Sequence, residues 1–274
     1  MNAVFILAGL TIREAVRRRV FMAALLVAGL FVMFAFLPLT IKPNPIFPPE
    51  KLFAWLGCGT IKFFSSVLAV TLAAGAITPE VERGILSVVV PKPLSRPAIY
   101  MGKWLGLITL LAVSVAAWGI LLAWAIWHQT GIFHPHIFTG VLAAFLFPLL
   151  FTTLTLCFSS FAGYALSAGL SLIVAGLSLA EDLLHRLSLP FVGLDSPILE
   201  TLSKAVGYLV PLSRMNHWIT RGLGDAGWDF SAVLEGRRTG QVDISTTNGD
   251  MVYIICYIAF FMLAGLFIFQ RRDL

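Results

Sequence analysis

The side chains of this chain that are best suited to chemistry are a few histidines and acidic residues between its apolar segments. His134 and His136 stand two residues apart, and Glu181 and His185 are spaced as two ligands on one helix face would be. Imidazole and carboxylate groups at such spacings can bind zinc or copper. Histidine also suits a membrane interface, and two-ligand spacings arise by chance. Because no cysteine accompanies these histidines, we do not predict a metal site and keep the four residues as candidates only.

A catalytic site on the same side would have to use Glu181, Asp182 and His185, but no complete catalytic constellation accompanies them. The sequence contains neither H-E-x-x-H nor G-x-S-x-G. It also lacks G-x-x-x-x-G-K-[ST], since its one Gly-Lys pair, Gly102-Lys103, is followed by Trp and has no upstream glycine. We therefore expect that this chain is not an enzyme and does not hydrolyse ATP. A polytopic membrane enzyme remains an alternative that activity of the purified chain would support.

The elements that carry these residues are long apolar segments. Hydrophobic residues make up 58% of the 274 residues, charged ones 12%, and mean hydropathy is +0.90. An α-helix needs about 20 apolar residues to cross a hydrocarbon core about 30 Å thick. The stretch 129–180 carries no Asp, Glu, Lys or Arg, which is enough for a hairpin of two such helices. We predict an all-α integral membrane protein, a single domain over 1–274, with spans at about 20–39, 60–79, 104–127, 137–158, 163–180 and 251–269.

Basic residues indicate the topology, because Lys and Arg near membrane helices stay preferentially in the cytoplasm. The N-terminal segment has four, the 78–103 loop four and the C-terminal tail two, ten in all, against two in the short loops 40–59 and 128–136. Both termini are therefore predicted to be cytoplasmic, with an interfacial helix over 3–19 and a large outer segment over 181–250. The residues expected to anchor the inner interface are Arg13, Arg17, Arg18, Arg19 and Lys103.

The net charge of +5 could suggest nucleic acid, but the basic residues are distributed as in a membrane protein, so we expect the lipid bilayer as the partner. Lys62 is expected to lie at the outer end of the second span and to reach the headgroups. The predicted spans have no ionisable residue in their middle, which argues against a proton-coupled secondary transporter. The outer segment contains a helical pattern at 197–209 and is expected to form surface helices or a small cap.

The loop 78–103 has an unusual pattern for a connection between two spans. Thr78 could cap a helix that begins at Pro79 and runs to about 90, where Pro91 ends it. Ser95 could cap the next helix, which continues into the third span. On physical grounds alone, the 79–90 helix could be an ordinary interfacial helix with solvated charges or a lever between two membrane helices.

The loop resembles the cytoplasmic segment of ABC-2-type exporter permeases, whose pattern is roughly E-x-E-x-G-T-L, then P-x-S-R and a Lys before the next helix. Ile85 stands where the family usually has Thr. The resemblance extends over the whole chain, through the basic N-terminal helix, the six spans and the long outer segment. Within the family it is most similar to permeases for multicopper-enzyme maturation, including those of nitrous-oxide reductase. The matching residues are Glu80, Glu82, Gly84, Leu86, Pro93, Ser95, Arg96 and Lys103.

This resemblance implies a multi-pass permease of a bacterial cytoplasmic (inner) membrane that works with a separate ABC-type ATP-binding subunit. ATP and Mg²⁺ would bind to that partner, and this chain would carry no cofactor. The 79–90 segment would be a coupling helix that docks on the ATPase, and a second copy or a sister permease would complete the unit. The residues implied in ATPase coupling are Glu80, Glu82, Arg83, Gly84, Leu86 and Arg96.

Two alternatives remain open beside an exporter. The chain could be a membrane assembly or regulatory protein that docks an ATPase without transport, or an outer-side component of copper handling. The spans are rich in Phe and Leu, as any lipid-facing helix is, so they indicate no substrate.

Overall fold

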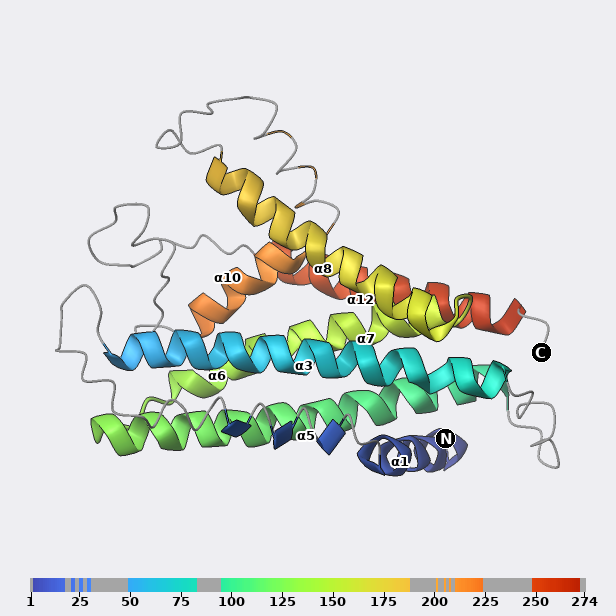
Figure 1. Cartoon of the computed structure of the whole chain (residues 1–274), viewed down its shortest axis with the longest axis horizontal. Coiled ribbons are helices and arrows are strands. Elements are labelled where there is room, and N and C mark those ends of the chain that lie inside the picture. The colour runs from blue at the N-terminus through green and yellow to red at the C-terminus, as the bar shows by residue number, and fades with distance from the viewer. Residues whose placement is uncertain are drawn as a thin grey trace.

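The computed structural model describes residues 2–17, 21–22, 25–26, 29–30, 49–82, 95–187, 201, 205, 207, 210–223 and 248–271. Within these ranges the regular structure is α-helical, and no strand forms (Figure 1). The helices are α1 (Asn2–Arg17), α3 (Pro49–Glu82), α5 (Arg96–Thr130), α6 (His136–Ala144), α7 (Leu146–Ser159), α8 (Tyr164–Leu187), α10 (Leu212–Gly222) and α12 (Asn248–Arg271).

Four helices of the described ranges are long and apolar enough to cross a membrane. They are Phe53–Ile77, Arg96–His128, His136–Ser159 and Gly249–Arg271. They overlap the spans predicted at 60–79, 104–127, 137–158 and 251–269, so an all-helical, multi-pass membrane protein is confirmed.

The other two predicted spans are not established. The apolar part of α8 covers Tyr164–Leu177, shorter than a full span. Most of the predicted span 20–39 lies outside the described residues, as does the helix predicted at 197–209. Six spans and two cytoplasmic termini therefore stay predictions. Figure 1 shows the N- and C-terminal ends at the same end of the molecule, as an even number of spans requires.

The centre of the bundle is α3, which packs against α7 and α5. In Figure 1, α3 and α5 run side by side in opposite directions, and α8 leans away from them. The packed face of α3 includes Ala69, Ala73 and Ala74, each 0% exposed. Such small residues let membrane helices approach closely.

One predicted span, 137–158, contains a break that sequence reasoning did not foresee. Pro148 has no N–H to donate to the carbonyl of Ala144, and a proline ring crowds that carbonyl. The helix accordingly ends at Ala144 and restarts at Leu146. The N–H of Phe145 still donates to Val141 O at 3.1 Å, so α6 and α7 continue as one spanning rod.

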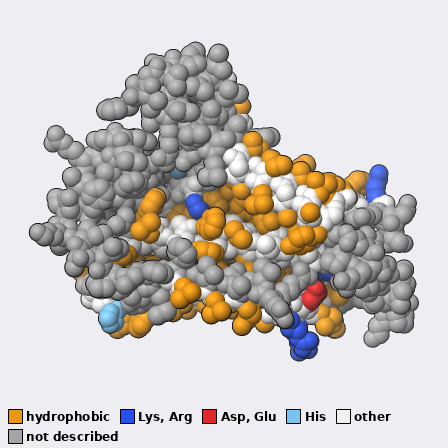
Figure 2. Space-filling model, viewed as in Figure 1, with side chains coloured by type: hydrophobic (Ala, Val, Ile, Leu, Met, Phe, Trp, Pro, Cys, Tyr) orange, Lys and Arg blue, Asp and Glu red, His pale blue; other side chains and the backbone are white. Residues whose placement is uncertain are grey.

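The turn between α5 and α6 depends on a glycine. Gly131 has a φ of +70° and donates its N–H to Trp127 O at 2.8 Å. This left-handed cap ends α5 and returns the chain as α6. On the face shown in Figure 2, hydrophobic side chains dominate the described surface, and most charged ones lie towards the α1 end.

The end of the bundle opposite α1 is covered by α10, which packs on α6. Leu212 and Met215 of α10 are buried, and Thr139 of α6 donates its hydroxyl to Gly222 O. Lys62 of α3 donates its ammonium to Asn216 Oδ1 of α10 at 2.8 Å. The ammonium of Lys62 thus has an acceptor within the protein, and its expected contact with the headgroups stays a prediction.

Candidate functional site

The candidate site is the first three turns of α5 with the preceding residue, 95–107, which we call the α5 start. The loop that resembles the ABC-2 segment leads directly into it. Ser95 occupies the N-cap position with extended backbone, and Pro97 lies in the first turn. The Ser95 carbonyl accepts the Ala98 N–H at 2.9 Å, but its hydroxyl makes no capping bond, which differs from the expected side-chain cap.

One face of the α5 start contacts the last turns of α12. Arg96 Nη1 donates to Gln270 O at 3.2 Å. This carbonyl lies at the C-terminal end of α12, whose partial negative charge favours a cation. The Tyr100 side chain is fully buried, with its ring centroid 6.0 Å from that of Phe269. Gly265 makes room for it, since a Cβ there would meet the Tyr100 hydroxyl. The start of α5 and the end of α12 are thus joined by an ionic hydrogen bond and an aromatic contact.

A second face of the α5 start lets α1 approach unusually closely. Gly102 and Gly106 are four residues apart, so they share a helix face. A Cβ on Gly106 would lie 2.7 Å from Ala8 O, and one on Gly102 would lie 2.6 Å from Leu7 Cβ. Figure 1 shows α1 nearly end-on, so this helix crosses the long helices rather than running along them. The two glycines hold that crossing helix against α5.

The side of the α5 start that carries Arg96 also reaches α3, two turns further along the helix, through Lys103. Its side chain is 6% exposed, and Nζ donates to the backbone carbonyl of Ala76. A buried ammonium costs several kcal/mol unless polar partners replace its water. The Ala76 carbonyl, six residues before the end of α3, supplies one such partner.

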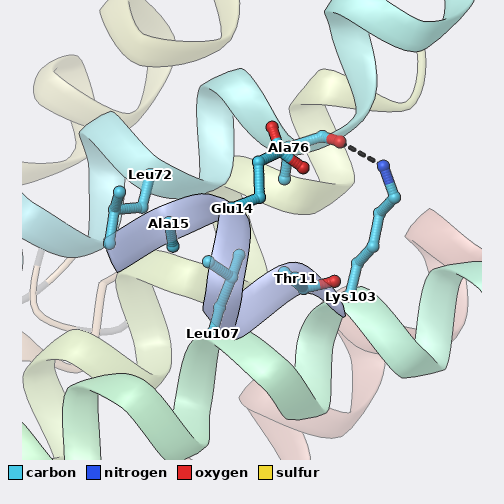
Figure 3. A pocket seen from close by; sticks show the side chains of 7 residues that line it. All are labelled: Thr11, Glu14, Ala15, Leu72, Ala76, Lys103 and Leu107. Atoms are coloured by element: carbon cyan, nitrogen blue, oxygen red, sulfur yellow. Dashed lines mark hydrogen bonds between the residues drawn. The ribbon is translucent and has the colours of Figure 1, made fainter. Parts of the chain in front are cut away.

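Lys103 lies in a small pocket where α1, α3 and α5 meet (Figure 3). Figure 3 shows Glu14 extending from α1 towards α3, beside the Lys103–Ala76 hydrogen bond. Lys103 was predicted to be an anchor at the inner interface, and that role stays a prediction. The structure shows that its side chain is directed into the protein. The residues that line the pocket are Thr11, Glu14, Ala15, Leu72, Ala76, Lys103 and Leu107.

The end of α3 also differs from the expected pattern. Thr78 and Pro79 continue α3, which runs without a break to Glu82, so Thr78 does not cap a separate helix. Pro79 has no N–H to donate to the carbonyl of Gly75. Side chains of neighbouring helices donate to the two carbonyls on either side of Gly75: Lys103 to Ala76 O, and the hydroxyl of Ser159 in α7 to Ala74 O at 3.4 Å.

Only some of the predicted coupling and anchor residues can be located. Arg96 and Lys103 come together in the α5 start, and Arg13 and Arg17 are exposed on α1. The backbone of Glu80 and Glu82 ends α3, but their side chains lie outside the described residues. The other predicted residues of these two groups also lie outside them: Arg18, Arg19, Arg83, Gly84 and Leu86.

The candidate metal ligands lie far from this site. His134 and His136 stand at the α5–α6 turn, at the other end of α5. Glu181 and His185 fall in α8, but their side chains lie outside the described residues. Within the described ranges, no three His, Cys, Asp or Glu side chains gather as a metal site would require.

Sequence reasoning missed the contact of α1 with α5 and the inward direction of Lys103. A signal existed for the first, because Gly102-Lys-Trp-Leu-Gly106 has the G-x-x-x-G spacing of close helix pairs. No comparable signal existed for Lys103, since the residue is basic and stands next to a predicted span. Its acceptor is a backbone carbonyl 27 positions away in the chain.

Comparison with known protein families agrees with the loop and the helices. The family described as ABC-2 family transporter protein matches residues 5–274, almost the entire chain. A comparison with curated proteins finds no match. Permeases of the matched family are typically non-catalytic membrane subunits that pair with an ATP-binding subunit. The chain therefore belongs to the ABC-2 family of transporter proteins.

Proposed function

We propose that this chain is the transmembrane permease subunit of an ATP-driven, exporter-type ABC transporter, with the loop 78–103 as its coupling segment. The observation that carries the proposal is that the segment resembling the ABC-2 loop leads into the α5 start. That start contacts α12 through Arg96, α1 through Gly102 and Gly106, and α3 through Lys103. A displacement applied to the segment would therefore act on three other helices at once.

In the proposed cycle, ATP and Mg²⁺ bind to a separate ABC-type ATPase and bring two such subunits together. The coupling segments follow, and each α5 start moves the helices bound to it. A change in these helices then alters the side to which a path between the spans opens. This chain supplies no catalytic residue to the reaction; it positions helices.

The working unit would contain two permeases and two ATPases in a bacterial cytoplasmic membrane. The second permease would be another copy of this chain or a sister chain. The resemblance to multicopper-enzyme maturation permeases supports a role in the maturation of such enzymes as the finer assignment within the family.

Charge reversal at the end of α3 tests the proposal. The wild-type chain, purified gently with the ABC-type ATPase that accompanies it, should raise the ATP turnover of that ATPase. Glu82→Lys should abolish this stimulation, because the substitution places a cation in the segment proposed to dock. Glu50→Lys is the matched control, since Glu50 lies in the first turn of the same helix, and it should retain stimulation. ATPase assays on reconstituted complexes measure both.

Insertion of the Glu82→Lys chain must remain normal, as judged by its yield and monodisperse elution. If no ATPase accompanies the wild-type chain, or if Glu82→Lys stimulates turnover as the wild type does, the proposal is wrong. A protein that only docks an ATPase would differ in another respect: cross-links that immobilise its spans would leave ATP turnover unchanged.

A further inference from the structure

We propose that Lys103 is a positioning residue that closes the coupling segment at its base, so that the end of α3 and the start of α5 move as one body. The inference rests on the proposed function and assigns one residue a role within it. The contact concerned is the hydrogen bond from Lys103 Nζ to Ala76 O, which we call the Lys103 tie.

The position of the tie supports this role. Lys103 is the last residue of the segment 78–103, and Ala76 lies two residues before its first. The tie joins α3, six residues before its last residue Glu82, to α5, seven residues after its first residue Arg96. A displacement of the chain between the two helices reaches the tie through the last turns of α3 and the first turns of α5.

The chemistry of the tie indicates that Lys103 has a role beyond filling space between the helices. Lys103 is 6% exposed, so its charge is costly to bury, and a Met side chain would fill a similar volume without this cost. Ionisable residues within spanning helices are expected to serve function. The acceptor is a backbone atom, so the tie holds the course of α3 itself and not the rotamer of one side chain.

The neighbours of Lys103 extend the body that the tie creates. Gly102 and Gly106 hold α1 on the adjacent face of α5, and Leu107 lines the same pocket as Lys103. Thr11 and Glu14 of α1 line that pocket from the other side. The tie therefore lies at the junction of three helices. Without it, motion of the segment would separate α3 from α5 and would not be passed on to the bundle.

The first test removes the donor while it keeps the volume of the side chain. In the complex with the accompanying ATPase, Lys103→Met should lower permease-stimulated ATP turnover about tenfold, as expected for loss of one charge-assisted hydrogen bond. Lys103→Arg, which keeps a cationic donor, should restore most of it. Lys62→Met is the matched control, because Lys62 is also a partly buried lysine in a spanning helix. The Lys62→Met variant should stimulate ATP turnover as much as the wild type does.

The second test replaces the tie by a covalent link and also covers the case in which Lys103→Met does not fold. In a background with Ala at Cys58, Cys157 and Cys256, Ala76→Cys and Lys103→Cys are combined. Stimulated turnover should be low in this double variant, and a short bis-methanethiosulfonate linker should restore it. A role of Lys103 in local charge or solubility would not be restored by the linker.

The outcomes separate this inference from the proposed function. A wild-type complex without permease-dependent ATP turnover would overturn both. Wild-type stimulation together with equal stimulation by Lys103→Met would overturn the tie alone. A failure of the linker to raise turnover in the double variant would likewise overturn the tie and leave the permease assignment intact.

Discussion

At the scale of the residue, two lysines show how this protein holds charge inside apolar helices. Lys103 donates to a backbone carbonyl, whereas Lys62 donates to Asn216 Oδ1 at 2.8 Å and lies 5.0 Å from the centre of the Phe147 ring. Both belong to helices of spanning length. Lys62 is the tenth residue of the candidate span Phe53–Ile77, and the expectation that the spans have no ionisable residue in their middle stays a prediction.

The Lys62 contact predicts the effect of a single substitution on α10. Asn216→Ala removes the Oδ1 acceptor and should destabilise the protein by about 1–3 kcal/mol, because the partly buried ammonium loses a hydrogen bond. Thermal unfolding in detergent, followed by scanning fluorimetry, measures this effect. His217→Ala is the control, since the neighbouring side chain is exposed and should have little effect. Equal melting temperatures for Asn216→Ala and the wild type would show that the contact contributes nothing to stability.

At the scale of the element, glycines decide which helices meet. The helices are apolar on most sides, because their solvent is lipid, so hydrophobic periodicity does not tell which face meets a neighbour. Gly102 and Gly106 provide the missing specification for α1 on α5. The break at Pro148 shows a similar local cause, since one missing N–H divides a span into α6 and α7 without ending it.

The packing of α1 on α5 predicts different outcomes for two glycine substitutions. Gly106→Ala places a Cβ 2.7 Å from Ala8 O, so α1 must shift, and we expect a loss of about 1–3 kcal/mol. Gly59→Ala in α3 meets no atom within 4 Å and should be neutral or stabilising by up to about 1 kcal/mol. Melting temperatures of the two variants in the same detergent test this pair. The interpretation of α1 is wrong if Gly106→Ala is as stable as Gly59→Ala.

At the scale of the whole molecule, charge and architecture divide the bundle into two ends. One end has α1, the α5 start and the end of α12, where Arg96 meets Gln270 O. The other end has α10, joined to α12 by Arg214 and Asp250 at 3.6 Å. The positive-inside rule predicts that the first end faces the cytoplasm.

This orientation predicts the accessibility of single cysteines in intact cells. In a background without native cysteines, Ser95→Cys and Arg17→Cys should react with a membrane-impermeant maleimide only after the membrane is permeabilised. His136→Cys, at the exposed turn between α5 and α6, should react without permeabilisation. Labelling of Ser95→Cys from outside would invert the topology and remove the coupling segment from the reach of an ATPase.

The sequence alone determined the solvent of this protein, its helical class, the approximate position of four spans and its family. These properties depend on short segments of the chain, because the free energy of transferring a segment into the bilayer is the sum of the contributions of its residues. The loop pattern is local for the same reason, and it led to the family that the comparison then matched over 5–274.

Only the tertiary structure decided which polar groups meet. The acceptor of Lys62 is 154 positions away in the sequence, and that of Arg96 is 174 positions away. The burial of Lys103 depends on the packing of α3 beside α5, because the carbonyl of Ala76 accepts its hydrogen bond. A local pattern states what a side chain can bind, but the packing of helix faces determines which partner is within reach.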